Sequence, residues 1–342
     1  MSIGVFPGRF LPPHRGHLTG ILRAHALCDE LYVVVSERIE EDEQLCRSAG
    51  VAYVDGALRR RWLAQELKGL GIKIRLVDED EIPPSPYGWM EYAELVRAAV
   101  GKKIDLVFGG ETKYIEDHQR AFPEAEYRVL DPNRSKWNIS STEIRHHPYQ
   151  YWDYIVGAAR PFFTKRVLIT GTESCGKTTL TKKLAKVFYT SWSEEAGRTY
   201  QEDFLGGDGT LFELEDFNRI GHLQYEQDLK ALATSSKVCF FDTDAVVTRF
   251  FSLFFMGQVS SRLDSFIDPS KYDLVLALKP NVPWIDDGMR DTGEAIRDSN
   301  HEKLMKMYQD LGFDMKKFVT VSSPDYYERL ETCIREVEQL LG

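Results

Sequence analysis

The chain has 342 residues, 43% of them hydrophobic and 28% charged, which suits two soluble domains with separate cores. Its formal net charge of −10 argues against a broad nucleic-acid or membrane surface, because both partners present negative charge. No apolar stretch approaches the roughly 20 residues that span a bilayer, and no basic-then-apolar signal is visible, so we expect a cytoplasmic protein. The five cysteines are widely spaced, which predicts reduced thiols without disulfides or a zinc site.

In the first half, short apolar runs alternate with segments of helical periodicity. Strands are predicted at residues 3–6, 31–35, 72–77, 106–108 and 127–130, and helices include residues 17–28 and 57–70. Such alternation predicts a parallel sheet covered on both faces. Residues 148–163, rich in aromatic residues and proline, then precede a new apolar run, so we place a packed domain joint near residue 160.

The second half repeats the alternation. Strands are predicted at residues 166–170, 237–241 and 274–278, with a helix that runs through Lys186 after the first of them. The whole chain is therefore expected to be α/β, with one parallel-sheet domain at residues 1–160 and another at residues 161–342. No fixed-period repeat relates them, so they are expected to be distinct folds. Residues 250–255, apolar nearly all round, are interpreted as a buried helix.

The first strand leads into a glycine turn, residues 8–17, with the sequence GRFLPPHRGH. Its prolines and Gly16 favour a helix that starts around residues 16–17. Two imidazoles at a helix N-terminus, His14 and His17, suit a triphosphate, because they donate hydrogen bonds where the helix end adds partial positive charge. The alternative is that the two histidines only cap a turn.

A second segment, residues 139–145 with the sequence ISSTEIR, predicts a helix N-cap whose capping box uses Glu143, a purely structural explanation when taken alone. Together the two segments resemble the nucleotidyltransferase superfamily that carries (His/Thr)-x-Gly-His and Ile-Ser-x-Thr-x-x-Arg. The resemblance implies a Rossmann-like domain in which a substrate phosphate attacks the α-phosphorus of ATP. It implies catalytic roles for His14, His17 and Arg145, and ATP contacts from Gly8, Arg9, Phe10, Gly16, Ser140, Ser141 and Thr142.

Residues 171–178, GTESCGKT, match Gly-x-x-x-x-Gly-Lys-(Ser/Thr) between a predicted strand and a predicted helix. This pattern predicts a P-loop whose amides wrap ATP phosphates, with Lys177 on the β- and γ-phosphates and the Thr178 hydroxyl on Mg²⁺. Cys175 occupies a variable position and is expected to be an inert thiol. The predicted ATP contacts here are Gly171, Glu173, Ser174, Gly176, Thr178 and Thr179, with Arg290 and Arg297 from a segment described next.

Two later segments complete this second site. The run 238–244 has the form of a buried strand that ends in carboxylates, where Asp242 could hold Mg²⁺ or take a proton and Asp244 could bind a ribose hydroxyl. The alternative is a strand-ending turn with solvated aspartates. Residues 284–297 resemble the mobile lid of nucleoside and nucleotide kinases, whose arginines neutralise the transferred phosphate; the alternative is a surface loop with salt bridges.

Four further stretches, 59–62 (RRRW), 86–89 (PYGW), 131–134 (DPNR) and 195–198 (EAGR), resemble those of the NadR-type family. That family joins a nicotinamide-mononucleotide (NMN) adenylyltransferase to a P-loop ribosylnicotinamide kinase, and the resemblance covers essentially the whole chain. It implies ATP, Mg²⁺, ribosylnicotinamide, NMN and NAD as ligands, no DNA because no helix-turn-helix domain precedes the first strand, and a possible homo-oligomer. The substrate contacts it implies are Trp89, which would stack on the cationic pyridinium ring, Arg59, Glu195, Arg198, Asp244 and Trp284.

Two alternatives to this function remain open at the level of sequence. One keeps both chemistries and changes the acceptor, for example to a pantetheine- or cytidylyl-type substrate. The other is a regulator that senses ATP and NAD without efficient turnover. The intact Lys177, His14 and His17 argue against the regulator, because a pure sensor has less need of residues that promote group transfer.

Overall fold

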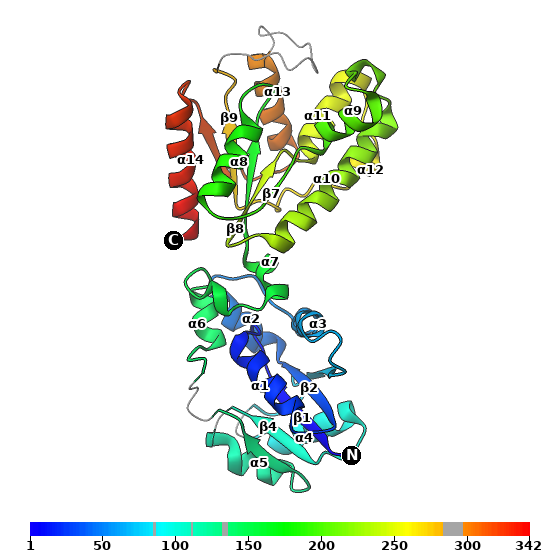
Figure 1. The fold of residues 1–342 in the computed structure, drawn as a ribbon, viewed down its shortest axis with the longest axis vertical. Coiled ribbons are helices and arrows are strands. Elements are labelled where there is room, and N and C mark those ends of the chain that lie inside the picture. Colours follow the sequence, from blue (N-terminus) through cyan, green and yellow to red (C-terminus); the bar gives the residue numbers. More distant parts are fainter. Residues whose placement is uncertain (85–86, 111, 132–135, 283–296) are drawn as a thin grey trace. The chain divides into compact units, whose positions relative to one another are not determined.

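The structure, a computed structural model, describes residues 1–84, 87–110, 112–131, 136–282 and 297–342. Contacts divide the chain into two compact units, Met1–Phe162 and Phe163–Gly342. Each unit is built around one sheet whose paired strands are all parallel, with helices on its faces (Figure 1). The predicted α/β class with two parallel sheets is confirmed. Among the described residues, no helix has both the length and the apolar character that crossing a membrane requires.

The first unit has the sheet order β3-β2-β1-β4-β5. Its elements are β1 (Ile3–Gly8), α1 (Arg15–His25), β2 (Glu30–Glu37), α2 (Ile39–Ser48), α3 (Gly56–Glu66), β3 (Lys73–Asp78), α4 (Trp89–Val100), β4 (Leu106–Gly109), η1 (Thr112–Tyr114), α5 (Ile115–Ala121), β5 (Glu126–Val129), α6 (Ser141–His146), η2 (Trp152–Tyr154), η3 (Gly157–Ala159) and α7 (Arg160–Phe163). Strand order reverses at β1, which pairs with β2 on one side and β4 on the other. In open parallel sheets, ligands bind beyond the carboxyl ends of the strands at such a point.

The strands of this sheet are apolar on both faces because both faces are covered. Val5 and Val34 pack in a cluster with α4, whereas Phe6, Val33 and Val35 pack in the opposite cluster with α1 and α3. A strand buried on both sides reads as a continuous apolar run, and β2 has that form. This pattern is why the sequence located the central strands well.

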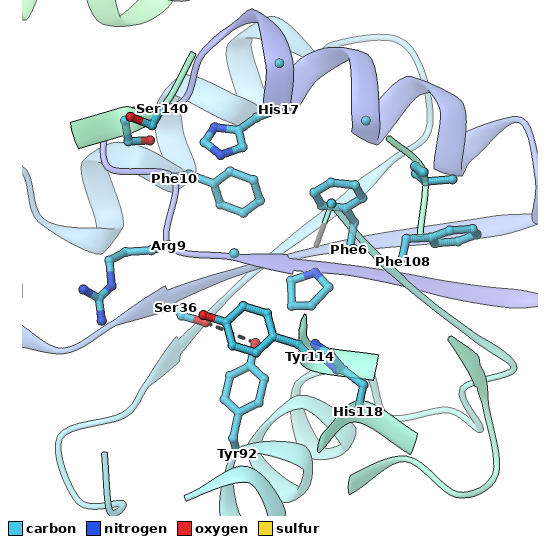
Figure 2. A pocket seen from close by; sticks show the side chains of 18 of the residues that line it. Phe6, Arg9, Phe10, His17, Ser36, Tyr92, Phe108, Tyr114, His118 and Ser140 are labelled. Carbon is cyan, nitrogen blue, oxygen red and sulfur yellow. Dashed lines mark hydrogen bonds between the residues drawn. The ribbon is translucent and has the colours of Figure 1, made fainter. Parts of the chain in front are cut away.

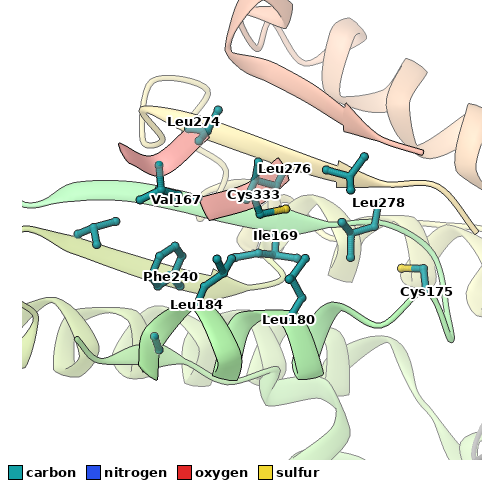
Figure 3. Close-up of a cluster of buried hydrophobic side chains, with 14 residues drawn as sticks. Val167, Ile169, Cys175, Leu180, Leu184, Phe240, Leu274, Leu276, Leu278 and Cys333 are labelled. Carbon is teal, nitrogen blue, oxygen red and sulfur yellow. The ribbon is translucent and has the colours of Figure 1, made fainter. Parts of the chain in front are cut away.

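The second unit has the sheet order β10-β9-β6-β8-β7. Its elements are β6 (Lys165–Thr170), α8 (Lys177–Val187), β7 (Trp192–Ser193), α9 (Ala196–Leu205), η4 (Gly209–Leu211), α10 (Leu214–Thr234), β8 (Val238–Asp242), α11 (Ala245–Met256), α12 (Ser261–Asp264), β9 (Leu274–Leu278), α13 (Arg297–Asp310), η6 (Met315–Lys317), β10 (Phe318–Val321) and α14 (Tyr326–Leu341). Figure 3 shows Ile169, Phe240 and Leu276 of the sheet packed against Leu180 and Leu184 of α8. Strand order reverses at β6, the strand that leads into residues 171–178.

Several predicted boundaries need correction. The helix expected from residues 17–28 runs from Arg15 to His25, because His14 already caps it and accepts a hydrogen bond from the Gly16 amide. Strands β7 and β10 were not predicted. They are edge strands of two and four residues, and β10 is partly exposed, so neither carries a long apolar run.

The segment at residues 250–255 is helical as predicted, but it is not fully buried. It is the second half of α11, and although Phe250 is buried, Leu253 and Phe254 are 37% and 45% exposed. Apolar residues on every side do not require burial on every side, because much of a protein surface is contributed by apolar atoms.

Candidate active sites

The first site lies beyond the carboxyl end of β1, where the chain enters α1. His14 adopts an extended conformation as the N-cap of α1, and its Nδ1 accepts from the Gly16 amide at 3.1 Å. The rings of His14 and His17 stack with centroids 3.7 Å apart, and Phe10 meets His17 edge-on at 4.9 Å. A Cβ at Gly16 would come within 2.9 Å of the His14 ring, so glycine at this position allows the stacked pair to form.

The segment that precedes α6 closes on this loop. Ser140 is the N-cap of α6 and forms the predicted capping box with Glu143. The Ser141 hydroxyl donates to the Pro12 carbonyl at 2.9 Å, and the buried Arg145 donates to the Leu11 carbonyl. Arg145 also donates to the Thr142 hydroxyl at 3.2 Å. The two sequence motifs, about 130 positions apart, are therefore held together by side chain to backbone hydrogen bonds.

A cavity of about 700 Å³ opens beside this junction, within the usual size range of small-molecule sites. Figure 2 shows His17, Phe10 and Ser140 on one side of it, and Tyr92, Tyr114 and His118 on another. Residues that line it include Gly8, Arg9, Phe10, His14, Gly16, His17, Ser36, Arg38, Glu79, Trp89, Tyr92, Tyr114, His118, Tyr127, Ser140 and Ser141. Most of the predicted contacts thus share one cavity, although Thr142, which is exposed, and Arg145, which is buried, do not line it.

Arg59 is placed elsewhere. Its side chain is fully buried and donates to the Asp42 carboxylate at 2.7 Å and to the carbonyls of Ser36 and Arg9. Arg9 itself pairs with Glu41 at 2.8 Å and remains 34% exposed toward the cavity. Arg59 therefore supports the β1–α1 loop, because the Asp42 carboxylate and the Ser36 and Arg9 carbonyls take its donors and it does not line the cavity.

The sequence missed the aromatic side of the cavity. Tyr92 on α4, Tyr114 on η1, His118 on α5 and Tyr127 on β5 converge with Trp89, yet they follow no short motif. His118 stacks on Tyr127 with centroids 4.5 Å apart and meets Trp89 edge-on at 4.8 Å. Only the packing of separate elements brings these rings together, so no local sequence pattern predicted that they line the cavity.

The second site lies beyond the carboxyl end of β6. Gly171, Ser174 and Gly176 have φ values of 151°, 51° and 87°, and α8 begins directly after them at Lys177. A Cβ at Gly171 would lie 2.7 Å from the Leu278 carbonyl oxygen, so the loop needs glycine there. The buried Lys177 donates to the Thr172 carbonyl at 2.9 Å across the loop. Thr179 is exposed in the first turn of α8.

Arg329 of α14 fixes this loop and was not predicted. It is 2% exposed and donates to the Cys175 carbonyl at 2.9 Å, to the Lys279 carbonyl at 2.7 Å and to the Asn281 side chain. Cys175 is buried, and burial raises the pKa of its thiol, which agrees with the expected inert role. Because Arg329 lies 154 positions after Cys175, its local sequence could not predict this contact with the loop.

Asp242 ends β8 beside β6, where Ile169 is its partner in the register. Its side chain is fully buried, and neither carboxylate oxygen has a hydrogen-bond partner among the described residues. Burial, with the nearby Glu195 carboxylate, raises its pKa to about 6, against the opposing effects of Lys177 and the Thr178 hydroxyl. Two unpartnered carboxylate oxygens next to a hydroxyl suit a hard cation such as Mg²⁺, which prefers oxygen ligands.

The next two residues turn the chain into α11. Thr243 has a φ of 93°, a strained value for a β-branched residue, and it is buried. Asp244 then caps α11 by accepting from the amides of Val246 and Val247, and it also accepts from the Tyr308 hydroxyl at 2.8 Å. One oxygen of Asp244 therefore has a structural role, and burial raises the pKa of this carboxyl to about 6.

A small cavity of about 30 Å³ lies near these residues. Glu195, Gly197 and Thr243 line it together with the aromatic rings of Phe212, Phe217, Phe251 and Phe255. Arg198 is exposed in the first turn of α9 and does not line it. Arg297, the first residue of α13, is buried and donates to the Val282 carbonyl. The predicted Trp284 and Arg290 lie outside the described residues, as do Pro86 and residues 132–134.

Known proteins resemble this chain over its full length. Residues 166–329 match a family model described as an AAA domain. The "Trifunctional NAD biosynthesis/regulator protein NadR" of Escherichia coli (strain K12) is 33% identical over 349 aligned residues, which cover 100% of this chain and 84% of that protein. A "Nicotinamide-nucleotide adenylyltransferase" of Thermococcus sibiricus is 30% identical over 45% of this chain and 77% of its own length.

Solved structures agree with these relatives. A NadR protein in complex with NR has a TM-score of 0.83 at 26% identity and covers 100% of this chain and 96% of its own. A NadR protein in complex with NAD and AMP-PNP has a TM-score of 0.81 at 27% identity, covering 99% and 95% respectively. Identity above 30% over the whole chain, with both α/β units in the same order, shows the relationship: the chain belongs to the NadR family.

Proposed function

We propose that the chain makes NAD from ribosylnicotinamide in two ATP-dependent steps. Residues 161–342 transfer the γ-phosphoryl group of ATP to the 5′-hydroxyl of ribosylnicotinamide, which yields NMN and ADP. Residues 1–160 then join NMN to the adenylyl group of a second ATP and release pyrophosphate. The observation that carries the proposal is the full-length likeness to NadR proteins, one of them in complex with NR and one with NAD and AMP-PNP.

The cavity of the first unit supports the adenylyl transfer. An NMN phosphate oxygen attacks the α-phosphorus of ATP, and the bond from that phosphorus to the β-phosphate oxygen breaks. His14 and His17, stacked at the start of α1, donate hydrogen bonds to the phosphates as charge moves onto pyrophosphate. Ser140, which lines the cavity, is assigned to the departing β- and γ-phosphates, whereas Thr142 and Arg145 do not line it and stay predictions for these contacts. The step needs no covalent enzyme intermediate, because placement and charge stabilisation supply the acceleration.

The acceptor of this step fits the aromatic side of the same cavity. A pyridinium ring is cationic and flat, and aromatic faces attract such a cation by their quadrupole. Trp89 offers an indole face, and Tyr114 lies 5.5 Å from it between ring centroids. Arg59 acts on this site only indirectly, because it holds the Arg9 carbonyl and thereby the loop that carries Phe10.

The second unit supports transfer of the γ-phosphoryl group. Lys177 leaves the Thr172 carbonyl and binds the β- and γ-phosphates, and the amides of residues 171–178 surround them. Thr178 and Asp242 would hold Mg²⁺, which neutralises phosphate charge when it is bound. The acceptor hydroxyl oxygen attacks the γ-phosphorus, ADP leaves, and the hydroxyl proton passes to a carboxylate. Asp242 can take only one of these two roles at a time, Mg²⁺ ligand or proton acceptor, because a carboxylate bound to a cation is a weak base.

The nucleoside is assigned to the region of the small aromatic cavity. Glu195 and the Thr243 hydroxyl provide polar groups there, while the phenylalanine rings must move apart to admit a pyridine ring. The second oxygen of Asp244 is assigned to a ribose hydroxyl, with the first retained by the helix cap. Arg198, Trp284, Arg290 and Arg297 stay predictions for contacts with the nucleoside and the transferred phosphate.

One assay with two starting materials tests the proposal. The protein is incubated with ATP and Mg²⁺ plus either ribosylnicotinamide or NMN, and NMN, NAD, ADP and pyrophosphate are followed by chromatography. We expect ADP, pyrophosphate and NAD from the nucleoside, and pyrophosphate and NAD without stoichiometric ADP from NMN. Absence of NAD in both reactions, with turnover of 4′-phosphopantetheine or another phosphorylated acceptor, would assign the chain a different substrate.

A further inference from the structure

The link between β7 and α9 in the second unit is short and lies at the edge of the sheet. β7 has only two residues, Trp192 and Ser193, and it pairs with β8 on one side. Glu194 and Glu195 then lead into α9, which packs beside α10 (Figure 1). So short a strand contributes few ladder hydrogen bonds, and the first amides of a helix have no partner inside the helix. Contacts outside the sheet must therefore fix this link.

Gln224 of α10 holds the link through its side-chain amide. Its Oε1 accepts from the Ala196 amide at 2.9 Å. Its Nε2 donates to the Glu194 carbonyl and to Ser193 Oγ, each at 3.0 Å. A backbone N–H only donates and a carbonyl only accepts, so this position calls for a side chain with both an acceptor and a donor. The carboxamide of a buried glutamine meets both demands.

Two further side chains complete what we call the α9 bracket, which consists of Ser193, Gln224, Asp228 and Lys271. Oδ1 of Asp228 accepts from Ser193 Oγ at 2.5 Å and from Gln224 Nε2 at 2.9 Å. Its Oδ2 accepts from Lys271 Nζ at 2.5 Å. Ser193, Gln224 and Asp228 are all at most 3% exposed. A buried polar network whose members are all partnered makes a structure rigid and favours one arrangement of its elements.

The bracket leads to the Glu195 side chain. Glu195 is the N-cap residue of α9, a position whose side chain often accepts from an amide of the first turn, yet it makes no such bond. The first amide of α9, that of Ala196, is instead satisfied from α10 by Gln224. Glu195 lines the small aromatic cavity with Thr243, and its carboxylate is close enough to Asp242 to raise the pKa of that group. The link fixed by the bracket thus carries a residue of the second site.

On the basis of the proposed function, we propose that Gln224 is a positioning residue of the kinase site. Its carboxamide fixes residues 194–196 against α10 and thereby keeps the Glu195 carboxylate at the cavity assigned to ribosylnicotinamide. Gln224 does not line that cavity, so it acts through Glu195. In the described part of the chain, no hydrogen bond joins the bracket to residues 171–178. Nucleoside binding is therefore expected to depend on the bracket, and ATP binding is not.

The test measures KM for ribosylnicotinamide and KM for ATP separately. Gln224→Met keeps the length of the side chain and removes both hydrogen-bonding groups. It should raise KM for ribosylnicotinamide by about 10-fold or more and KM for ATP by less than about twofold, because a small displacement of one binding group affects only the ligand it contacts. Gln224→Glu keeps the acceptor, loses the donor and places a second carboxylate beside Asp228, so the same KM should rise. Ser193→Ala removes one bond of the bracket and should have a smaller effect of the same kind.

Gln227→Met is the matched control. Gln227 precedes Asp228 on α10, and in the described part of the chain no hydrogen bond joins it to residues 193–196. Both KM values should stay at the wild-type level in this variant. NAD formation from NMN is the internal control for the first unit, and thermal melting reports whether the second unit remains folded. If Gln224→Met unfolds that unit, Ser193→Ala takes its place in the comparison.

A double-mutant cycle decides whether Gln224 acts through Glu195. Glu195→Ala alone should raise KM for ribosylnicotinamide, and adding Gln224→Met should raise it little further, because the carboxylate to be positioned is already gone. Additive effects, or equal rises in KM for ATP and for the nucleoside, would show a purely structural role and overturn the inference. A wild-type chain that does not phosphorylate ribosylnicotinamide overturns both the proposed function and this inference. A wild-type chain that does so, with an unchanged KM for the nucleoside in the bracket variants, overturns only the role of Gln224.

Discussion

Replacing Asp242 with asparagine should make the ligand-free protein more stable and the kinase inactive. In the folded protein this carboxyl is fully buried and has a pKa of about 6, compared with 3.8 for an ordinary aspartate. The ionised form is therefore disfavoured by 6 − 3.8, about 2 pKa units, or about 3 kcal/mol. Asparagine removes this cost, but its buried amide lacks hydrogen-bond partners, which lowers the free energy of unfolding by about 1–2 kcal/mol. We expect a net stabilisation of about 1–2 kcal/mol at pH 7.5.

The pH dependence follows from the sign of the shift. Because the folded state holds this proton more tightly than the unfolded state, the cost of the carboxylate is complete above pH 6 and disappears as the pH falls toward about 4. The advantage of Asp242→Asn should therefore be largest at pH 7 to 8 and shrink on acidification. For a unit of this size, it corresponds to a rise in Tm of about 2–8 °C.

Calorimetry or fluorescence melting between pH 4.5 and 8, without nucleotide or Mg²⁺, measures the difference. Phosphorylation of ribosylnicotinamide should fall by on the order of 10²-fold or more, while NAD formation from NMN serves as the internal control. Asp208→Asn is the matched control. Hydrogen bonds from Thr210 lower the pKa of that exposed carboxyl, so this substitution should not stabilise the protein. A loss of stability at pH 7.5 in Asp242→Asn, or a gain that does not depend on pH, would refute this reasoning.

Three further substitutions separate the two sites. Lys177→Ala should reduce ribosylnicotinamide phosphorylation by on the order of 10²-fold or more and leave NAD formation from NMN unchanged; equal loss of both would contradict independent sites. His17→Ala should give the reverse pattern, measured in the same two assays. Gly16→Ala places a Cβ 2.9 Å from the His14 ring, so adenylyl transfer should fall while Tm changes little, and an unchanged rate would show that the stacked histidines are not needed.

The sequence could predict both glycine turns that we propose as ATP sites, because each turn depends on local backbone geometry. A strand, a glycine turn and a helix N-terminus are encoded within about ten residues, as at Gly171–Lys177 and at Gly8–His17. The central strands were equally readable, since burial on two faces produces continuous apolar runs. The edge strands β7 and β10 were not predicted, because a short, partly exposed strand shows little hydrophobic periodicity in the sequence.

Residues that act through distant partners could not be assigned from the sequence. Arg329 reaches the Cys175 carbonyl across 154 positions, and Arg145 reaches Leu11 across 134. Arg59 was expected to contact substrate, and nothing in its local sequence revealed that Asp42 and the Arg9 carbonyl would take its donors. Such pairs are set by which strands become neighbours, which is a property of the whole sheet.

By itself, the sequence determined that the chain has two α/β halves, and it predicted that two glycine turns bind nucleotide phosphate, because backbone geometry and phosphate recognition are local. Only the tertiary structure decided which side chains line the cavity of the first unit and what supports residues 171–178 of the second. The aromatic side of that cavity draws on β5, α4, α5 and η1. These rings meet only when separate elements pack together, so no single stretch of sequence could predict them.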